Sequence, residues 1–127
     1  MKHLNVLIAC EESQAECDAF RKLGHNAFSC DIQKCRRGGH PEYHIKGDVT
    51  QFLEGVTQFR TMDGRHHHLS RWHLIIAHPP CTYLCKSSSV QLMKDGVIDP
   101  NRLEKMTRAR EFFFQCLNAN APFVAVE

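Results

Sequence analysis

A single thiol in this sequence stands where an α/β protein would place reactive groups. Cys81 comes directly after Pro79-Pro80, which close the apolar run at residues 72–77. Because proline cannot donate to a sheet ladder, a strand formed by that run must end by Pro79. Ligands of open α/β sheets bind at the carboxyl ends of the strands. Cys81 is therefore a candidate nucleophile, and the alternative is a small buried side chain without chemistry.

Carboxylates follow three other short runs in the same manner. Asp31, Asp48 and Glu127 each stand at the end of an expected strand. An acid after a second strand is suited to accepting hydrogen bonds from a ribose diol. An acid after a third strand can accept one from an exocyclic amine. The alternative for Asp31 and Asp48 is the capping of turns, a common task of aspartate.

Continuous apolar runs and helical spacing predict the elements that position these residues. Strands are expected at residues 5–10, 26–32, 44–49, 72–77 and 122–127. Helical segments are expected at residues 15–23, 50–55 and 100–118. Strands that alternate with helices favour right-handed crossovers and a mostly parallel sheet. We therefore expect one domain, residues 1–127, with a three-layer Rossmann-like α/β fold of about five strands.

Helix ends and turns can also be read from single residues. Ser13 with Glu16 predicts a capping box at the start of the first helix, and Gly24 predicts its end. Asp99-Pro100 predicts the start of the last helix. An apolar stripe is expected along that helix at Leu103, Met106, Phe113, Phe114 and Leu117.

A hairpin is expected as an insertion at about residues 57–71. Asp63-Gly64 is the Asp-Gly signal of a β-hairpin turn. His66, His67 and His68 follow that turn. Because side chains alternate faces along a strand, these three cannot all converge on one ion.

The runs VLIAC, CDI, GDV, HPPCTYL and AVE occur in this order along the chain. That order resembles the motif order of S-adenosylmethionine-dependent DNA methyltransferases of the cytosine-C5 type, above all small phage-encoded members. The resemblance implies a methyltransferase-type Rossmann-like fold, DNA as a partner and S-adenosylmethionine as the cofactor. It also implies catalytic roles for Cys81, which would attack C6 of a flipped-out cytosine, and for Glu127, which would bind the edge of the base.

The same resemblance implies which residues hold the cofactor. Asp31 would hold the ribose, Asp48 the adenine amine, and a glutamate of the first loop the ammonium group of the methionine part. The implied cofactor-binding residues are Cys10, Glu11, Glu12, Asp31, Ile32, Asp48, Val49, His78 and Pro79. His78 stands where amine methyltransferases carry an acid or an asparagine, which favours carbon over nitrogen as the methylated atom.

Two departures from the family pattern suggest a second function. The first loop, residues 10–16, lacks the glycines of a usual cofactor loop. The family continues beyond the glutamate with further strands and a target-recognition region, so we expect an incomplete or inactive enzyme. The alternative function is a catalytically dead binding module, such as an inhibitor of a host defence protein. An unpaired sheet edge would also favour a homodimer.

Metal and phosphate contacts are further alternatives. Cys30, Cys35, His40 and His44 are spaced closely enough for a zinc site but match no familiar zinc module, and no metal is expected. Basic residues could track phosphates or simply be solvated. They are Lys34, Arg36 and Arg37 in one loop, and Arg102, Lys105, Arg108 and Arg110 on the last helix.

Composition limits the setting in which these groups act. The formal net charge is only +2, and the longest apolar runs are far shorter than a membrane span, so no membrane partner is expected. The apolar stretch near the beginning of the chain is too short for a signal peptide. Seven cysteines at uneven spacing fit free thiols in a reducing compartment. A cytoplasmic location is expected, in the host cell if the chain is phage-encoded.

Overall fold

The structure, a computed structural model, describes residues 3–80, 93–94 and 96–127. The strands are β1 Asn5–Ala9, β2 Asn26–Asp31, β3 His44–Lys46, β4 Gln58–Arg60, β5 His66–His68, β6 Leu74–Ala77, β7 Met93–Lys94, β8 Val97–Ile98 and β9 Phe123–Val126. The helices are α1 Ala15–Lys22, α2 Thr50–Leu53 and α4 Pro100–Leu117, with a short 3-10 helix at Pro41–Tyr43. Cys81 and Cys85 lie outside the described residues.

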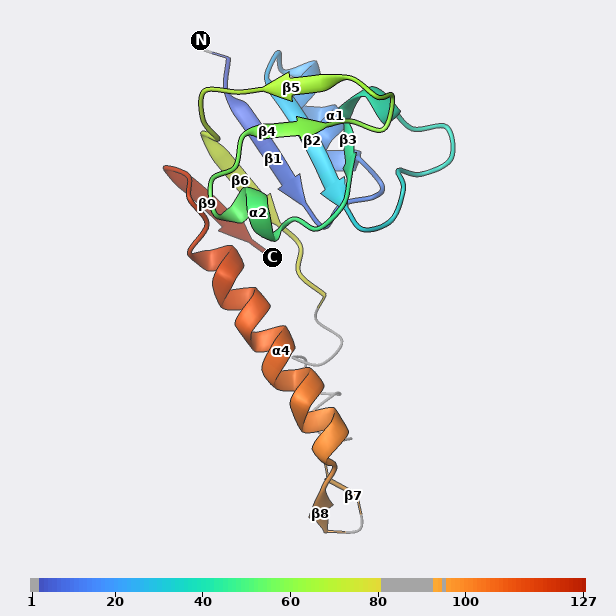
Figure 1. The fold of residues 1–127 in the computed structure, drawn as a ribbon, viewed down its shortest axis with the longest axis vertical. Coiled ribbons are helices and arrows are strands. Elements are labelled where there is room, and N and C mark those ends of the chain that lie inside the picture. The colour runs from blue at the N-terminus through green and yellow to red at the C-terminus, as the bar shows by residue number, and fades with distance from the viewer. Residues whose placement is uncertain (1–2, 81–92, 95) are drawn as a thin grey trace.

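Five strands form one sheet in the order β3-β2-β1-β6-β9, and each of its four pairings is parallel. This confirms the mostly parallel α/β sheet. The order reverses next to β1, because β2 and β3 lie on one side of it and β6 and β9 on the other. Parallel strands end at a common edge, which Figure 1 shows at the arrowheads of β1 and β2. In α/β proteins the reversal point of the order is where ligands bind.

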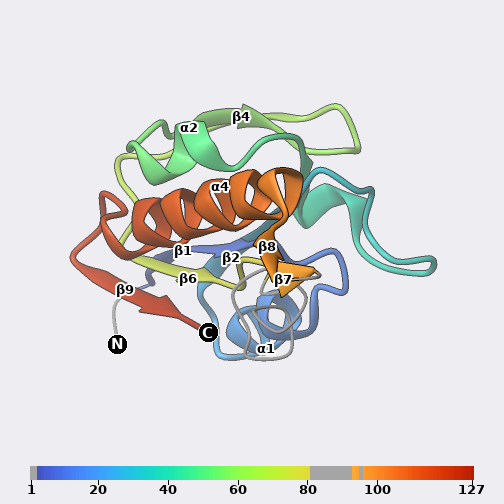
Figure 2. The same cartoon turned by 90° about the horizontal axis from the view of Figure 1, so that it is seen from below.

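Helices and a hairpin cover the two faces of the sheet. Figure 2 shows α1 below the sheet and α2, α4 and β4 above it. The side chains of β1 alternate between the faces: Val6 and Ile8 pack toward Cys17 of α1, and Leu7 packs into the core on the other side. Burying a side chain of this size contributes about 2 kcal/mol. Both faces of β1 are therefore core, as its continuous apolar run predicts.

The inserted hairpin is built as predicted. β4 and β5 pair antiparallel, and Gly64 takes a φ of 90° between them. Phe59 of β4 packs on Trp72, with ring centroids 5.7 Å apart, and on Phe28 of the sheet at 4.9 Å. The hairpin is thus fixed to the sheet by an aromatic core.

Two predictions about helix α1 fare differently. Gly24 follows the helix with a φ of 92°, as predicted for its end. The capping box is wrong, because the hydroxyl of Ser13 accepts from Ala15 N instead and the N-cap residue is Gln14. The carboxylate of Glu11 accepts the first free amides of the helix, from Glu16 N at 2.7 Å and Cys17 N at 3.3 Å.

Helix α4 begins as predicted but turns a different face to the core. Asp99 caps it through hydrogen bonds from Asn101 N and Arg102 N, with Pro100 in the first turn. Of the predicted apolar stripe, Leu103, Phe114 and Leu117 are exposed. Cys116 is the buried residue, and Phe112 packs against the core. The stripe fails because Phe112 and Cys116 mark the face of α4 that packs on the core, and Leu103, Phe114 and Leu117 lie on other faces of the helix.

Among the described residues, no helix is both long enough and apolar enough to cross a lipid bilayer.

Candidate functional site

A pocket of about 460 Å³ opens at the carboxyl ends of β1, β2, β3 and β6. It has the size of a small-molecule site. Its lining residues are Cys10, Cys30, Asp31, Ile32, Gln33, Gly47, Asp48, Val49, Thr50, Pro80 and Phe112. Five of the residues proposed from the sequence to hold a cofactor are therefore brought together here: Cys10, Asp31, Ile32, Asp48 and Val49.

The two aspartates of the pocket cap turns and still have an oxygen to offer. Asp31 Oδ1 accepts a hydrogen bond from Gln33 N at 2.8 Å. Asp48 Oδ1 accepts from Thr50 N at 2.9 Å and from the Thr50 hydroxyl at 2.7 Å. The turn-capping interpretation of both residues is thus correct. Each carboxylate has two acceptor oxygens, and the hydrogen bonds found among the described residues use Oδ1, so Oδ2 can serve a ligand.

The charge of Asp48 is stabilised by its own turn. The hydrogen bonds from the Thr50 hydroxyl and amide lower the pKa of Asp48 below its ordinary value of 3.8. Asp48 is exposed, so this carboxylate faces solvent at the pocket rim. It remains ionised, and therefore an acceptor, throughout the neutral pH range.

Cys10 turns the chain away from β1 into the pocket wall. It takes a φ of 64°, and its amide donates to Cys30 O at 2.7 Å. Gln14, at the other end of the same loop, has a φ of 61°. Non-glycine residues seldom adopt this left-handed conformation, and such positions cluster at functional sites. The loop therefore makes turns that glycine usually makes, although it contains none.

The Cys10 thiol is poorly reactive at neutral pH. Burial, and next the neighbouring Cys116, Asp31 and Asp48, raise its pKa to about 12. A thiol with this pKa is protonated at neutral pH, and the thiolate is the nucleophilic form. Cys10 is thus a neutral wall of the pocket.

The remaining residues proposed to bind cofactor lie elsewhere. Glu11 is 8% exposed and caps α1, and burial raises its pKa. Glu12 is exposed and lines a separate shallow surface beside Lys34 and Arg36. Pro79 is buried, and it is its neighbour Pro80 that lines the pocket.

His78 belongs to a group at the ends of β6 and β9. Its amide donates to Ala9 O at 3.0 Å and thereby continues the ladder between β6 and β1. Its Nε2 lies 3.0 Å from Glu16 Oε2, and its Nδ1 lies 3.6 Å from Glu127 Oε2. The predicted catalytic residue Glu127 therefore stands beside His78 rather than in the lining of the pocket.

The proposed zinc ligands do not form a cluster. Among the described residues, Glu16, His78 and Glu127 form the group of three or more such side chains that could hold a metal ion. His44 is fully buried, and its two ring nitrogens contact Ser29 Oγ at 2.8 Å and Gln33 O at 2.9 Å. Both nitrogens are therefore engaged in hydrogen bonds that join β2 to β3.

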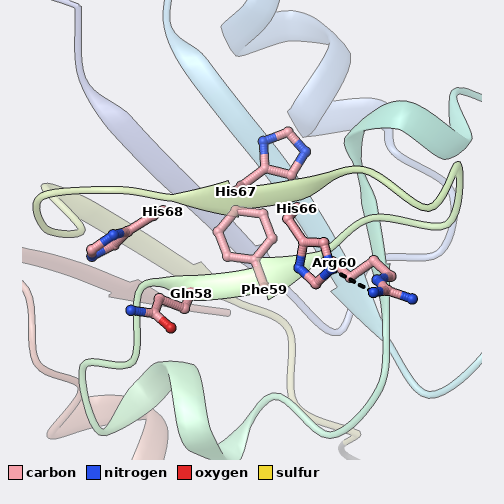
Figure 3. A pocket seen from close by; sticks show the side chains of 6 residues that line it. All are labelled: Gln58, Phe59, Arg60, His66, His67 and His68. Atoms are coloured by element: carbon pink, nitrogen blue, oxygen red, sulfur yellow. Dashed lines mark hydrogen bonds between the residues drawn. The ribbon is translucent and has the colours of Figure 1, made fainter.

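The three consecutive histidines divide between two faces, as predicted. The His67 ring stacks on Phe59 with centroids 5.1 Å apart. Figure 3 shows the ring of His66 turned toward Arg60, to which it is hydrogen-bonded. His66 and His68 are exposed. The hairpin surface that they line with Gln58 shares no lining residue with the candidate site.

Basic residues are partly paired. Arg36 forms an ion pair with Asp18 at 3.1 Å, and Arg108 pairs with Glu104 at 2.6 Å one turn earlier on α4. Exposed pairs of this kind contribute little to stability. Phosphate contact by these residues stays a prediction.

Sequence reasoning missed several residues of both sites. Gln33 and Thr50 each follow a predicted strand by one residue, and Gly47 directly precedes Asp48, so the aspartates could have pointed to them. Phe112 comes from α4, and no local pattern connects it to the pocket. Glu16 was read as a capping residue, which concealed its position beside His78.

No protein-family model, curated protein or solved structure matches this chain.

Proposed function

We propose that this chain is a Rossmann-like, S-adenosylmethionine-dependent methyltransferase of the cytosine-C5 type, with DNA as its substrate. One observation carries the proposal: Cys10, Asp31 and Asp48, from the ends of three adjacent parallel strands, line a single pocket. The motif order that suggested the family predicts that these strand ends hold an adenosine.

The donors and acceptors of the pocket suit the adenosine part of the cofactor. Asp31 Oδ2 would accept from the ribose hydroxyls, because Oδ1 is held by Gln33 N. Asp48 Oδ2 would accept from the adenine amine, because Oδ1 is held by Thr50. Val49 and Phe112 supply apolar surface between them for a flat base.

A neutral first strand end also fits a cofactor with a sulfonium and a carboxylate. The Cys10 thiol is uncharged, and the Glu11 carboxylate is turned into the start of α1. The repulsion that two adjacent glutamates would exert on the methionine carboxylate is thereby reduced. S-adenosylmethionine, when bound, supplies an electrophilic methyl group.

The chain's own residues would then activate the acceptor. Cys81 directly follows Pro80, which lines the pocket, and its thiol would add to C6 of a cytosine taken out of the stack. That addition would break the C5–C6 double bond and make C5 nucleophilic. After methylation at C5, loss of the C5 proton and of the Cys81 thiolate would restore the double bond. Glu127, whose amide is held by Ala77 O at 3.0 Å, would bind the edge of the base.

Calorimetry tests the cofactor step. Titration of S-adenosylmethionine into the protein should give a saturable heat, and Asp31→Asn should weaken the affinity by about tenfold, the loss expected for a hydrogen bond to a charged group. Asp63→Asn is the matched control, since Asp63 caps a turn of the distant hairpin. Absence of heat at millimolar ligand would overturn the proposal.

A trapping experiment tests the chemical step. DNA that contains 5-fluorocytosine should form a covalent adduct with the protein in the presence of S-adenosylmethionine. The adduct should be absent from Cys81→Ser and should form with Cys10→Ser, whose thiol is assigned to the pocket wall. An adduct that persists in Cys81→Ser would contradict the assigned nucleophile.

A further inference from the structure

Glu16, His78 and Glu127 come from three separate elements and meet beside the carboxyl edge of the sheet. Glu16 is in the first turn of α1, His78 follows β6 and Glu127 follows β9. One ligand atom from each residue lies within 4.8 Å of the other two. The group lies outside the lining of the pocket assigned to the cofactor.

The contact between Glu16 and His78 is not that of a hydrogen bond. Within the part of the chain that the structure describes, Glu16 Oε2 is buried and accepts no hydrogen bond, although His78 Nε2 lies only 3.0 Å away and forms an ion pair with it when the ring is protonated. A buried oxygen without a donor is costly unless something else compensates for it. Two neighbouring ligands of an octahedral ion with bonds of about 2.1 Å are separated by about 3.0 Å. The pair therefore has the spacing of two ligands on one ion.

Glu127 can complete the set with a small movement. One of its carboxylate oxygens lies within 4.8 Å of the ligand atoms of His78 and Glu16. Its Oε2 is 3.6 Å from His78 Nδ1, the ring nitrogen that does not contact Glu16, and its side chain is 75% exposed. Opposite ligands of an octahedral ion are about 4.2 Å apart, so the spread of 4.8 Å in the group is close to what one ion requires. An ion held by His78 Nε2 and Glu16 requires the exposed side chain of Glu127 to rotate toward Nε2.

The backbone of all three residues is held in place. Glu16 N donates to Glu11 Oε1 at 2.7 Å. His78 N and Glu127 N donate to Ala9 O and Ala77 O, each at 3.0 Å, as continuations of the sheet. The ligands are thus positioned by the fold, and rigid support of this kind is what metal sites need.

We propose that Glu16, His78 and Glu127 bind a divalent first-row transition-metal ion. One imidazole with two carboxylates is a borderline donor set that suits Mn²⁺, Fe²⁺ or Zn²⁺, and two carboxylates balance the charge of the ion. Three protein ligands leave coordination positions for water or a substrate oxygen. The inference does not rest on methyl transfer. Glu127 is also the residue proposed to contact the base, so the ion would lie beside the base-binding position.

Titration with Mn²⁺ tests the site in the absence of S-adenosylmethionine and DNA. Mn²⁺ is the probe because it prefers oxygen and imidazole ligands, whereas the seven thiols of the chain would also capture Zn²⁺. Loss of the electron paramagnetic resonance signal of free Mn²⁺ measures binding. We expect one ion per chain, with affinity reduced about tenfold or more by Glu16→Gln and by His78→Gln.

Matched controls separate this site from surface binding. Glu12→Gln and His68→Gln change exposed residues outside the group and should bind Mn²⁺ as the unchanged chain does. Circular dichroism verifies that Glu16→Gln and His78→Gln are folded. No stoichiometric binding at millimolar Mn²⁺, or binding equally strong in both variants, would overturn the proposal. Either result would leave the calorimetric test of the cofactor pocket unaffected.

Discussion

Thr50 donates two hydrogen bonds to a single oxygen of Asp48, from its amide at 2.9 Å and from its hydroxyl at 2.7 Å. The second carboxylate oxygen is the acceptor proposed for an adenine amine, and Asp48 lines the pocket. One oxygen of Asp48 thus caps a turn, and the other is proposed to bind a ligand. The two roles can be tested separately.

Asp48→Asn should reduce the affinity for S-adenosylmethionine by about tenfold, because an amide at this position accepts more weakly than a carboxylate. Asp63→Asn is again the control. Asp63 also accepts from a threonine hydroxyl and from an amide two residues on, and it lies on the hairpin. Calorimetry with both variants gives the comparison. Equal losses in the two would show that Asp48 has no special part in binding.

The pH dependence of stability should also change in Asp48→Asn. Because the pKa of Asp48 is lowered in the folded chain, its charge stabilises the fold above the ordinary value of 3.8, and this stability is lost as the pH falls through the folded value. Urea denaturation between about pH 3 and pH 7 should therefore give a larger free energy of unfolding for the unchanged chain than for the variant at neutral pH. The difference should become smaller as the pH falls. A gap that widens in acid contradicts this assignment.

Cys10 should react slowly with iodoacetamide at neutral pH, since burial raises its pKa to about 12. Bound S-adenosylmethionine should slow its alkylation further, because the thiol lines the proposed pocket. Peptide mass spectrometry of timed samples measures both rates. Cys35, half-buried and outside the pocket, is the internal control whose rate should not change with ligand. Rapid alkylation of Cys10 that ligand leaves unaltered would contradict the pocket assignment.

Glu11→Ala should lower the free energy of unfolding by about 1 kcal/mol, as the loss of a helix cap does. The pKa of Glu11 is raised by burial, so the stability linked to its proton is fully present below 4.5 and is lost as the pH rises through the folded value. Glu11→Gln carries no charge at this position, so its free energy of unfolding should rise relative to that of the unchanged chain as the pH rises. Denaturation curves at several pH values test both, with the exposed Glu12→Gln as a neutral reference.

Gly55→Ala should destabilise the chain by about 1–2 kcal/mol or more. Gly55 has a φ of 109°, and an added Cβ would lie 2.5 Å from Asn120 Nδ2. Gly64 also has a positive φ, of 90°, but an added Cβ there meets nothing within 4 Å. Gly64→Ala therefore measures backbone strain alone, and thermal unfolding should show a larger loss for Gly55→Ala. Equal losses would mean that Asn120 moves aside at no cost.

The sequence predicted most of what is local in this fold. Continuous apolar runs predicted the buried strands β1 and β6, and Asp99-Pro100 and Gly24 marked helix ends by their own conformational preferences. Strand ends then placed Asp31 and Asp48 at one edge. The pocket could be anticipated because parallel strands share the direction in which they end.

What failed depended on contacts between distant segments. Ser13 has the right type and spacing for a cap, but the left-handed turns at Cys10 and Gln14 bring Glu11 to the helix amides first. Phe114 is apolar at helical spacing and is exposed, because the sheet does not extend under that side of α4. The meeting of Glu16 with Glu127 has no sequence signature at all.

The pocket takes nine of its eleven lining residues from positions 10–50, and Pro80 and Phe112 are the other two. The residues proposed to handle the acceptor, Cys81 and Glu127, come from the later part of the chain. Most of the residues proposed to bind the methyl donor and those proposed to act on the acceptor base would thus come from separate segments of the sequence. Exchange of the segment after Pro80 for one from another sequence would keep Cys10, Asp31 and Asp48, and of the pocket lining it would replace Phe112 alone.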